Sequence, residues 1–206
     1  MTNIPSDHKV QLGVRDINFK FDGLLSPLAK TGRRLVFPYT PTINIGHTAN
    51  YGTYDMVHSV YQQNYYVNSP NPNISITAQF SSNSQSEAEY TCASIHFLKS
   101  LTKPDFGEKT KASTAGLPPP IAMFSGYGDL HFNNVPVIVR NFTYTLVEDG
   151  DYVTVNYEGF TSSVPTMMLA QIELTPQQLP KNVRENFNVK SYRNGSLLKG
   201  EGGGFI

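Results

Sequence analysis

The chain has 206 residues, no formal net charge and only 16% charged residues, whereas a typical soluble domain carries about 25%. This length suffices for one large domain with a buried core, and the charge balance lacks the basic excess typical of tight nucleic-acid binding. The single Cys92 excludes an internal disulfide framework, no apolar run approaches the ~20 residues of a membrane span, and the first residues do not resemble a signal peptide, which fits folding in the cytosol.

The start of the chain is predicted to be an arm rather than part of the core. Residues 1–34 form this N-terminal arm, with alternating apolar residues that predict two short strands near Val10–Val14 and Ile17–Phe21. Leu35–Phe37 and Ile43–Ile45 then read as extended segments. We therefore expect the main β domain to begin at residue 35.

The best strand pair in the sequence is predicted at Tyr54–Val67 and Ile74–Phe80. Asn68–Asn73 between them is rich in Pro and Asn, which favour chain reversal. The second strand alternates between an apolar face, Ile74, Ile76, Ala78 and Phe80, and a polar face, Ser75, Thr77 and Gln79. This pattern is typical of a hairpin with one buried face.

Charge is almost missing from this hairpin. Between Arg34 and Lys99 the chain has no lysine or arginine, and its only acids there are Asp55, Glu87 and Glu89. Soluble proteins usually place charged side chains on exposed strands, because charge blocks edge-to-edge pairing. The uncharged surface therefore either packs against other copies of the chain or faces something for which fixed charge is a handicap.

One helix is predicted, at Ser84–Thr102, with Ser84 and Glu87 as a capping box and Pro104 as its stop. Its apolar stripe comprises Tyr90, Ser94, Ile95, Phe97, Leu98 and Leu101. Further strands are predicted at Ile121–Phe124, Val135–Tyr144, Tyr152–Tyr157 and Thr166–Leu174. The predicted fold is thus mainly β with one α-helix, divided into an arm (1–34), a β domain (35–180) and a C-terminal extension (181–206).

No group of residues predicts an active site. The five histidines lack the spacing of a zinc site, and Asp55, His58 and Ser59 are too close along one predicted strand to converge as a triad. The acids around Gly150 could bind a cation or serve acid–base chemistry, but they are also ordinary turn residues. We expect no enzymatic activity, no metal and no cofactor.

A series of short motifs nevertheless resembles a known family over about residues 35–206. These motifs are Phe37–Ile45, Ala49–Asp55, Ala88–Leu98, Gly116–Pro120, Phe124–Gly128, Asn134–Val137, Asp151–Val153, Val164–Thr166 and the Gly-rich end at Phe205–Ile206. In this order the motifs resemble the baseplate tube-initiator and tube-cap proteins of contractile-tailed bacteriophages. No single motif is specific to the family; the ordered series carries the resemblance.

The resemblance implies a tail-tube fold, with two packed antiparallel sheets in a sandwich or small barrel and a long hairpin that lines a lumen. It also implies a structural virion protein of the tail baseplate, assembled in the bacterial cytoplasm as a homohexameric ring. The ring joins the baseplate hub to the tail tube or to a second initiator ring, starts tube polymerisation and lets double-stranded DNA pass. The tape measure protein is a further candidate partner, and no membrane binding is implied.

Two sets of residues would carry this function. The candidates for the lumen-facing side of the hairpin are Ser59, Tyr61, Gln63, Ser75, Thr77 and Gln79. The candidates for contacts between rings are Glu108, Lys109, Lys111, Phe205 and Ile206. Two alternatives of other classes remain: a monomeric β-sandwich module that binds carbohydrate or protein through its tyrosines, and a small hydrolase that uses His58 or the acids at 148–151.

Overall fold

The computed structural model describes residues 8–16, 19–104, 116–147, 150–157, 160–198 and 204–206. Its strands are β1 (Gln11–Val14), β2 (Arg34–Val36), β3 (Thr42–Gly46), β4 (Asn50–Tyr54), β5 (Gln63–Asn68), β6 (Asn73–Ser81), β7 (Ala122–Gly126), β8 (Phe132–Leu146), β9 (Tyr152–Tyr157), β10 (Phe160–Pro165) and β11 (Met167–Pro176). Every strand pairing is antiparallel. The prediction of a mainly antiparallel β fold is therefore confirmed.

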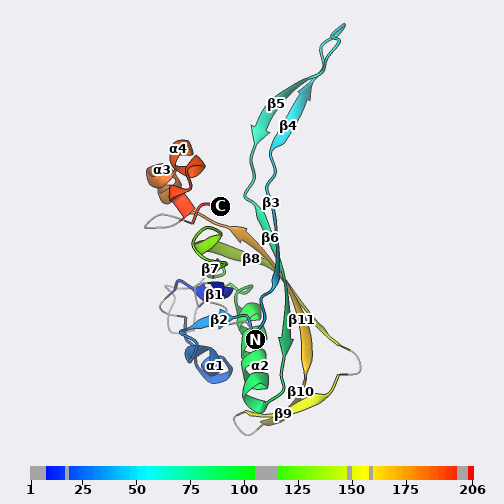
Figure 1. The fold of residues 1–206 in the computed structure, drawn as a ribbon, viewed down its shortest axis with the longest axis vertical. Coiled ribbons are helices and arrows are strands. Elements are labelled where there is room, and N and C mark those ends of the chain that lie inside the picture. Colours follow the sequence, from blue (N-terminus) through cyan, green and yellow to red (C-terminus); the bar gives the residue numbers. More distant parts are fainter. Residues whose placement is uncertain (1–7, 17–18, 105–115, 148–149, 158–159, 199–203) are drawn as a thin grey trace.

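The arrangement of the sheets differs from two sheets packed face to face. Within the described residues, seven strands form one sheet in the order β2-β1-β7-β8-β11-β6-β3, and the pairs β9–β10 and β4–β5 form two small sheets. The β4–β5 pair projects from the body as a long arm, whereas β9–β10 lies at the opposite end (Figure 1).

The prediction of a single helix is wrong, because the described residues form four: α1 (Ser26–Ala29), α2 (Gln85–Ser100), α3 (Pro180–Asn186) and α4 (Val189–Arg193). Two 3₁₀ turns, η2 (Gly23–Leu25) and η4 (Ser196–Leu198), accompany them. The missed helices span only one or two turns, so they show no sustained apolar period. For two of them, α1 and α3, a proline near the first turn, Pro27 or Pro180, was the only sequence signal of a helix start.

The predicted long helix is confirmed as α2. The Ser84 hydroxyl accepts a bond from the Glu87 N–H (3.4 Å), and the Glu87 carboxylate accepts one from the Asn83 N–H (2.8 Å). The buried side of α2 includes the fully enclosed Phe97 and Leu98, and its C-cap residue Leu101 is also fully buried. It packs against the apolar face of the main sheet to form the core.

Strand β6 shows how the sheet separates its two faces. Ile74, Ile76, Ala78 and Phe80 are buried, and the residues between them are exposed. On one side β6 pairs with β3, with Ile76 opposite Ile43, and on the other with β11, with Ile76 opposite Ile172. Because side chains alternate along every strand, this register places one continuous apolar row against α2 and one polar row outside.

The predicted hairpin is wrong in its first strand and in its pairing: Tyr54–Val67 is not one strand, whereas Ile74–Phe80 is confirmed within β6. The chain runs up through β3 and β4, turns at residues 55–62, and returns through β5 and β6 (Figure 1). Strand β5 therefore pairs with β4, and β6 pairs with β3 and β11. The Pro- and Asn-rich segment 69–72 connects β5 to β6 along one arm and does not reverse the chain.

The described part of residues 1–34 lies in the core rather than in a detached arm. Strand β1 lies between β2 and β7 in the main sheet. Leu12 and Leu28 are buried there, and the ring of Phe19 packs edge-on against that of Phe97 on α2, with centroids 5.8 Å apart. These contacts join segments far apart in the sequence, so the local pattern could not reveal them.

The C-terminal segment also folds back onto its own chain. The Phe205 side chain is only 8% exposed, and its ring lies 5.4 Å from that of Phe187. Gln178 donates a hydrogen bond to the Gly204 carbonyl (2.9 Å), and the Phe205 N–H bonds to the Leu197 carbonyl (3.3 Å). The described end of the chain thereby holds α3 and α4 close to β8 (Figure 1).

Tyr90 joins α2 to the edge strand β2. Its hydroxyl donates to the Val36 carbonyl (2.7 Å) and accepts from the Val36 N–H (2.8 Å). Burial raises the pKa of this phenol, and the hydrogen bond to Val36 opposes the rise only in part. The folded state therefore holds the neutral form more tightly than the unfolded state does.

We expect this linkage to make the protein sensitive to alkali. The contribution of Tyr90 to stability is fully present below pH 10.0 and is lost as the pH rises towards its higher folded-state pKa. Tyr90→Phe should cost about 1–3 kcal/mol near neutral pH, because both Val36 groups lose their partner, and should lessen the alkaline loss. Urea unfolding across this pH range measures both effects. Tyr39→Phe, at a half-exposed phenol bonded to Ser81 (2.7 Å), is the control and should leave the alkaline loss unchanged.

Candidate assembly surface

The outer face of four neighbouring strands forms a broad polar surface, which we call the polar ribbon; it spans β3, β6, β11 and β8. One row across it reads Thr42, Thr77, Gln171 and Thr143, and the next reads Asn44, Ser75, Glu173 and Asn141. All eight side chains are exposed. The predicted residues Ser75, Thr77 and Gln79 lie on this outer face.

The polar ribbon is nearly uncharged. Of the paired positions in its two rows, only Glu173 carries a charge. Arg140 lies at the bulge in β8, where the register with β11 shifts. Thr, Ser, Asn and Gln therefore form most of a surface on which soluble proteins usually display charge.

The edges of the polar ribbon have no strand partner among the described residues. Strand β3 pairs only with β6. Strand β8 pairs with β7 only up to Val137, so Ile138–Leu146 has β11 on one side and no described strand on the other. Strand edges of this kind present free N–H and C=O groups, which are a template for pairing with another chain.

The β4–β5 arm continues beyond the ribbon and is exposed on both faces (Figure 1). Four tyrosines lie along it, Tyr51, Tyr54, Tyr65 and Tyr66, with 56–62% of each side chain exposed. Tyr51 and Tyr66 are opposite each other, with ring centroids 5.9 Å apart. A two-stranded hairpin is marginally stable by itself in water, so these uncovered aromatic faces suit a surface that packs in an assembly.

A close contact shapes the other face of the arm. Gly52 lies opposite Tyr65 in the register of β4 and β5. A Cβ atom at Gly52 would approach the Tyr65 Cζ atom to 2.5 Å. The absence of a side chain at Gly52 therefore leaves room for the Tyr65 ring beside the partner strand.

The turn at the end of the arm, residues 55–62, is ordered by local hydrogen bonds. Gln62 donates to the Asp55 carboxylate (2.8 Å), and Ser59 donates to the Tyr61 carbonyl (2.7 Å). The Asp55 and Ser59 side chains thus bond to partners other than His58, so these residues do not form a triad. Of the predicted lumen residues, Ser59 and Tyr61 lie in this turn and Gln63 begins β5.

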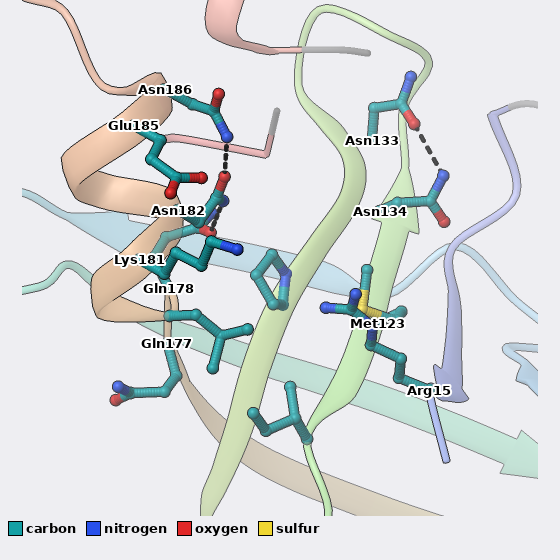
Figure 2. Close-up of a pocket in the computed structure, with 13 residues that line it drawn as sticks. Arg15, Met123, Asn133, Asn134, Gln177, Gln178, Lys181, Asn182, Glu185 and Asn186 are labelled. Atoms are coloured by element: carbon teal, nitrogen blue, oxygen red, sulfur yellow. Dashed lines mark hydrogen bonds between the residues drawn. The ribbon is translucent and has the colours of Figure 1, made fainter. Parts of the chain in front are cut away.

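A groove of about 640 Å³ lies between α3 and the strands β7 and β8 (Figure 2). Its walls carry six side-chain amides, from Asn133, Asn134, Gln177, Gln178, Asn182 and Asn186. Several of them bond to one another, as in the bond from Asn182 to Gln178 (2.8 Å) and that from Asn186 to Asn182. The described residues that line the groove include one carboxylate, Glu185, and no Ser, Cys or His. Amide side chains therefore dominate the lining, and Lys181, Glu185 and Arg15 are its only charged residues among those described.

Among the described residues, the remaining titratable groups do not gather into a metal site. No cluster of His, Cys, Asp and Glu that could hold a metal ion occurs in the described part of the chain. Cys92 is half-buried on α2, where burial raises the pKa of its thiol despite the nearby charge of Lys99. The nucleophilic thiolate is therefore disfavoured. The sequence Gly126–His131 forms a turn after β7, with Tyr127 and Gly128 at positive φ.

The predicted contacts between rings have mixed outcomes. Glu108, Lys109 and Lys111 lie outside the described residues, as do two of the acids near Gly150, Glu148 and Asp149. Phe205 is buried against its own chain and Ile206 packs against the core, so the described end is not a freely exposed tail; its contact with another ring stays a prediction.

The chain matches no protein-family model, and no curated protein matches it significantly. Among the described residues, no helix is long and apolar enough to span a membrane.

We expect Gly52→Ala to loosen the arm, since the new methyl group would displace the Tyr65 ring. Gly46→Ala is the matched control, because nothing lies within 4 Å of a Cβ atom at that position. Amide hydrogen exchange of β4 and β5, followed by mass spectrometry, measures the effect. Faster exchange only in the Gly52 variant is the expected result; equal exchange in both variants would show that the Tyr65 contact does not order the arm.

Proposed function

We propose that this chain is a structural subunit of the tail baseplate of a contractile bacteriophage, in which a hexameric ring connects the central hub to the tail tube and starts tube polymerisation. The observation that carries the proposal is the polar ribbon, a wide, almost uncharged β surface with two free edges. The family is proposed from its resemblance to the motif series described above. The tail-tube fold that this family implies is part of the proposal. The activity is templating, without a chemical reaction.

The strand directions of the polar ribbon support ring closure. Strands β3, β6, β11 and β8 are successively antiparallel, so the outermost two, β3 and β8, also run in opposite directions. The free edge of β8 in one copy can therefore pair antiparallel with the free edge of β3 in the next copy. Repeating this contact around a ring would close a barrel without leaving an edge.

The composition of the ribbon supports a lumen for DNA. In a closed ring the outer face of each ribbon would line the channel, with Ser75, Thr77 and Gln79 among its residues. Lysines at such positions would bind phosphates and release counterions, which produces tight and salt-sensitive contacts. Hydroxyl and amide side chains avoid that attraction, so double-stranded DNA can slide past them.

The proposed partners follow from the position of the ring between the hub and the tail tube. Copies of the same chain would form the ring, which would contact the hub on one side and the tail tube protein or a second initiator ring on the other. The tape measure protein is a further proposed partner within the channel. Assembly would take place in the bacterial cytoplasm, and the final location would be the virion.

Negative-stain electron microscopy of the purified chain, alone and mixed with the hub and tube proteins of the same phage, tests the proposal. We expect rings with a central hole, or tubes that form only when this chain is present. A chain that stays monomeric, does not join the hub and does not seed tubes would overturn the proposal and favour a monomeric binding module.

We expect lysines at Ser75, Thr77 and Gln79 to slow DNA ejection while particles still assemble, because the new charges would attract DNA phosphates. The control places three lysines at exposed positions on β9 and β10, Thr154, Asn156 and Ser163. Ejection from purified particles is followed by the fluorescence of a DNA-binding dye. Slower ejection that recovers as the salt concentration rises is expected only for the ribbon variant; unchanged kinetics would contradict a lumen position.

A further inference from the structure

The groove beside α3 continues across the half of the main sheet that lies away from the polar ribbon. One row of the register crosses β2, β1, β7 and β8 there and reads Arg34, Gly13, Met123 and Pro136. The groove lies over Met123 and Pro136, and a second hollow of about 310 Å³ lies over Gly13 and Arg34. The two hollows share the lining residues Arg15, Met123 and Asn134. Together they form one continuous depression, which we call the trough.

A chain of hydrogen-bonded amides forms the wall of the trough on the α3 side. Asn186 donates to the side-chain carbonyl of Asn182, which donates in turn to that of Gln178 (2.8 Å). Gln178 donates to the main-chain carbonyl of Gly204 (2.9 Å). This chain fixes the orientation of each amide, but an amide has two N–H donors and two acceptor lone pairs. Each of the three side chains therefore has hydrogen-bonding capacity left for a ligand in the trough.

The spacing of these amides matches an extended peptide. Asn182 and Asn186 are four residues apart on α3, which corresponds to a rise of about 6 Å along a helix. Main-chain groups of one orientation recur every second residue in an extended chain, at about 6.6–6.8 Å. The sheet side offers two more oriented amides, because Asn134 donates to Asn133 (3.0 Å) and Asn133 donates to Asp129 (2.8 Å). Both walls can thus bond to the main chain of one extended segment.

Positive charge predominates along the trough. Its described lining contains the cations Arg15, Arg33, Arg34 and Lys181 and the carboxylates Asp16 and Glu185. Lys181 extends from the α3 side and Arg15 from the sheet side (Figure 2). The Arg34 side chain lies over Gly13, where a Cβ atom would be 3.1 Å from the Arg34 Cγ atom. Among the described residues, no carboxylate pairs with Arg15, Arg34 or Lys181, so these three exposed cations are available to the acidic groups of a ligand.

We propose that the trough binds an extended, acidic peptide segment of a partner protein. The amides of the two walls bond to the main chain of this segment, and Arg15, Arg34 and Lys181 pair with its carboxylates. The inference goes beyond the proposed function and needs no ring, so the two can fail separately.

The lining favours a peptide over a nucleic acid. The Glu185 carboxylate would repel a phosphate backbone, whereas it can accept a hydrogen bond from a peptide N–H. The described lining also contains no aromatic side chain on which a base could stack. A duplex of DNA is therefore the competitor in the test.

Binding of a fluorescein-labelled peptide of alternating aspartate and serine to the purified chain tests the proposal by fluorescence anisotropy. We expect binding that weakens as the salt concentration rises. The same peptide with asparagine in place of aspartate should bind about tenfold more weakly, the change expected from one lost charge-assisted hydrogen bond. An N-methylated form of the acidic peptide should also bind more weakly, because it lacks the main-chain N–H donors.

The charge variant is Arg15→Gln with Lys181→Gln, which should weaken binding of the acidic peptide about tenfold or more. Arg140→Gln with Lys103→Gln is the matched control, since both residues are exposed, lie outside the trough and remove the same charge. The control should bind the peptide nearly as tightly as the unaltered chain does.

The amide variant is Asn182→Ala with Asn186→Ala, which should weaken binding of both the acidic and the neutral peptide, because both share the main chain. Circular dichroism checks that each variant is folded. No binding of the acidic peptide, equal binding by the charge variant and its control, or displacement of the peptide by a short DNA duplex that binds more tightly would overturn the inference. Ring formation by the same proteins, scored by negative-stain electron microscopy, tests the proposed function independently.

Discussion

The alternation of side chains along β6 is the constraint on which the rest of the structure depends. Its buried face, from Ile74 to Phe80, meets α2, and its exposed face forms the middle of the polar ribbon. A register shift of one residue would exchange the two faces. Burying Ser75 and Thr77 while exposing two isoleucines would cost desolvation and lose the core, so the apolar face fixes which side remains available to partners.

In the arm the alternation of side chains no longer separates a buried face from an exposed face. Beyond Gly46 and Asn73 no described helix or sheet covers either side, and β4 and β5 expose most of their residues on both faces. Cross-strand contacts such as Tyr51–Tyr66 and Tyr65 over Gly52 supply local order. They contribute only a few tenths to about 1 kcal/mol each, so these cross-strand contacts by themselves stabilise the arm only weakly.

The two chain ends strengthen the body and leave the ribbon open. Strand β1 completes the part of the sheet that closes over α2, and Phe205 packs with Phe187 near α3. Neither described end segment pairs with the free edges of β3 or β8. The core is thus closed within one chain, whereas the edges that could pair remain accessible. This division suits a subunit that folds first and assembles afterwards.

The sequence by itself determined the features that arise from local periodicity. The alternation of β6, the apolar stripe and cap of α2, and the absence of lysine and arginine between Arg34 and Lys99 were all readable from it. They predicted the strand-rich fold, the buried and exposed faces, and an uncharged surface. The exposed positions of Ser75, Thr77 and Gln79 were therefore predictable.

Only the tertiary structure decided which strands pair and where the ends lie. A strand pattern specifies faces but not partners, so the sequence could not show that β5 pairs with β4 instead of β6. The burial of Leu12 and Phe205 likewise depends on contacts between distant segments. Such features arise from packing between segments that are far apart in the sequence, so the pattern of a local stretch of residues does not predict them.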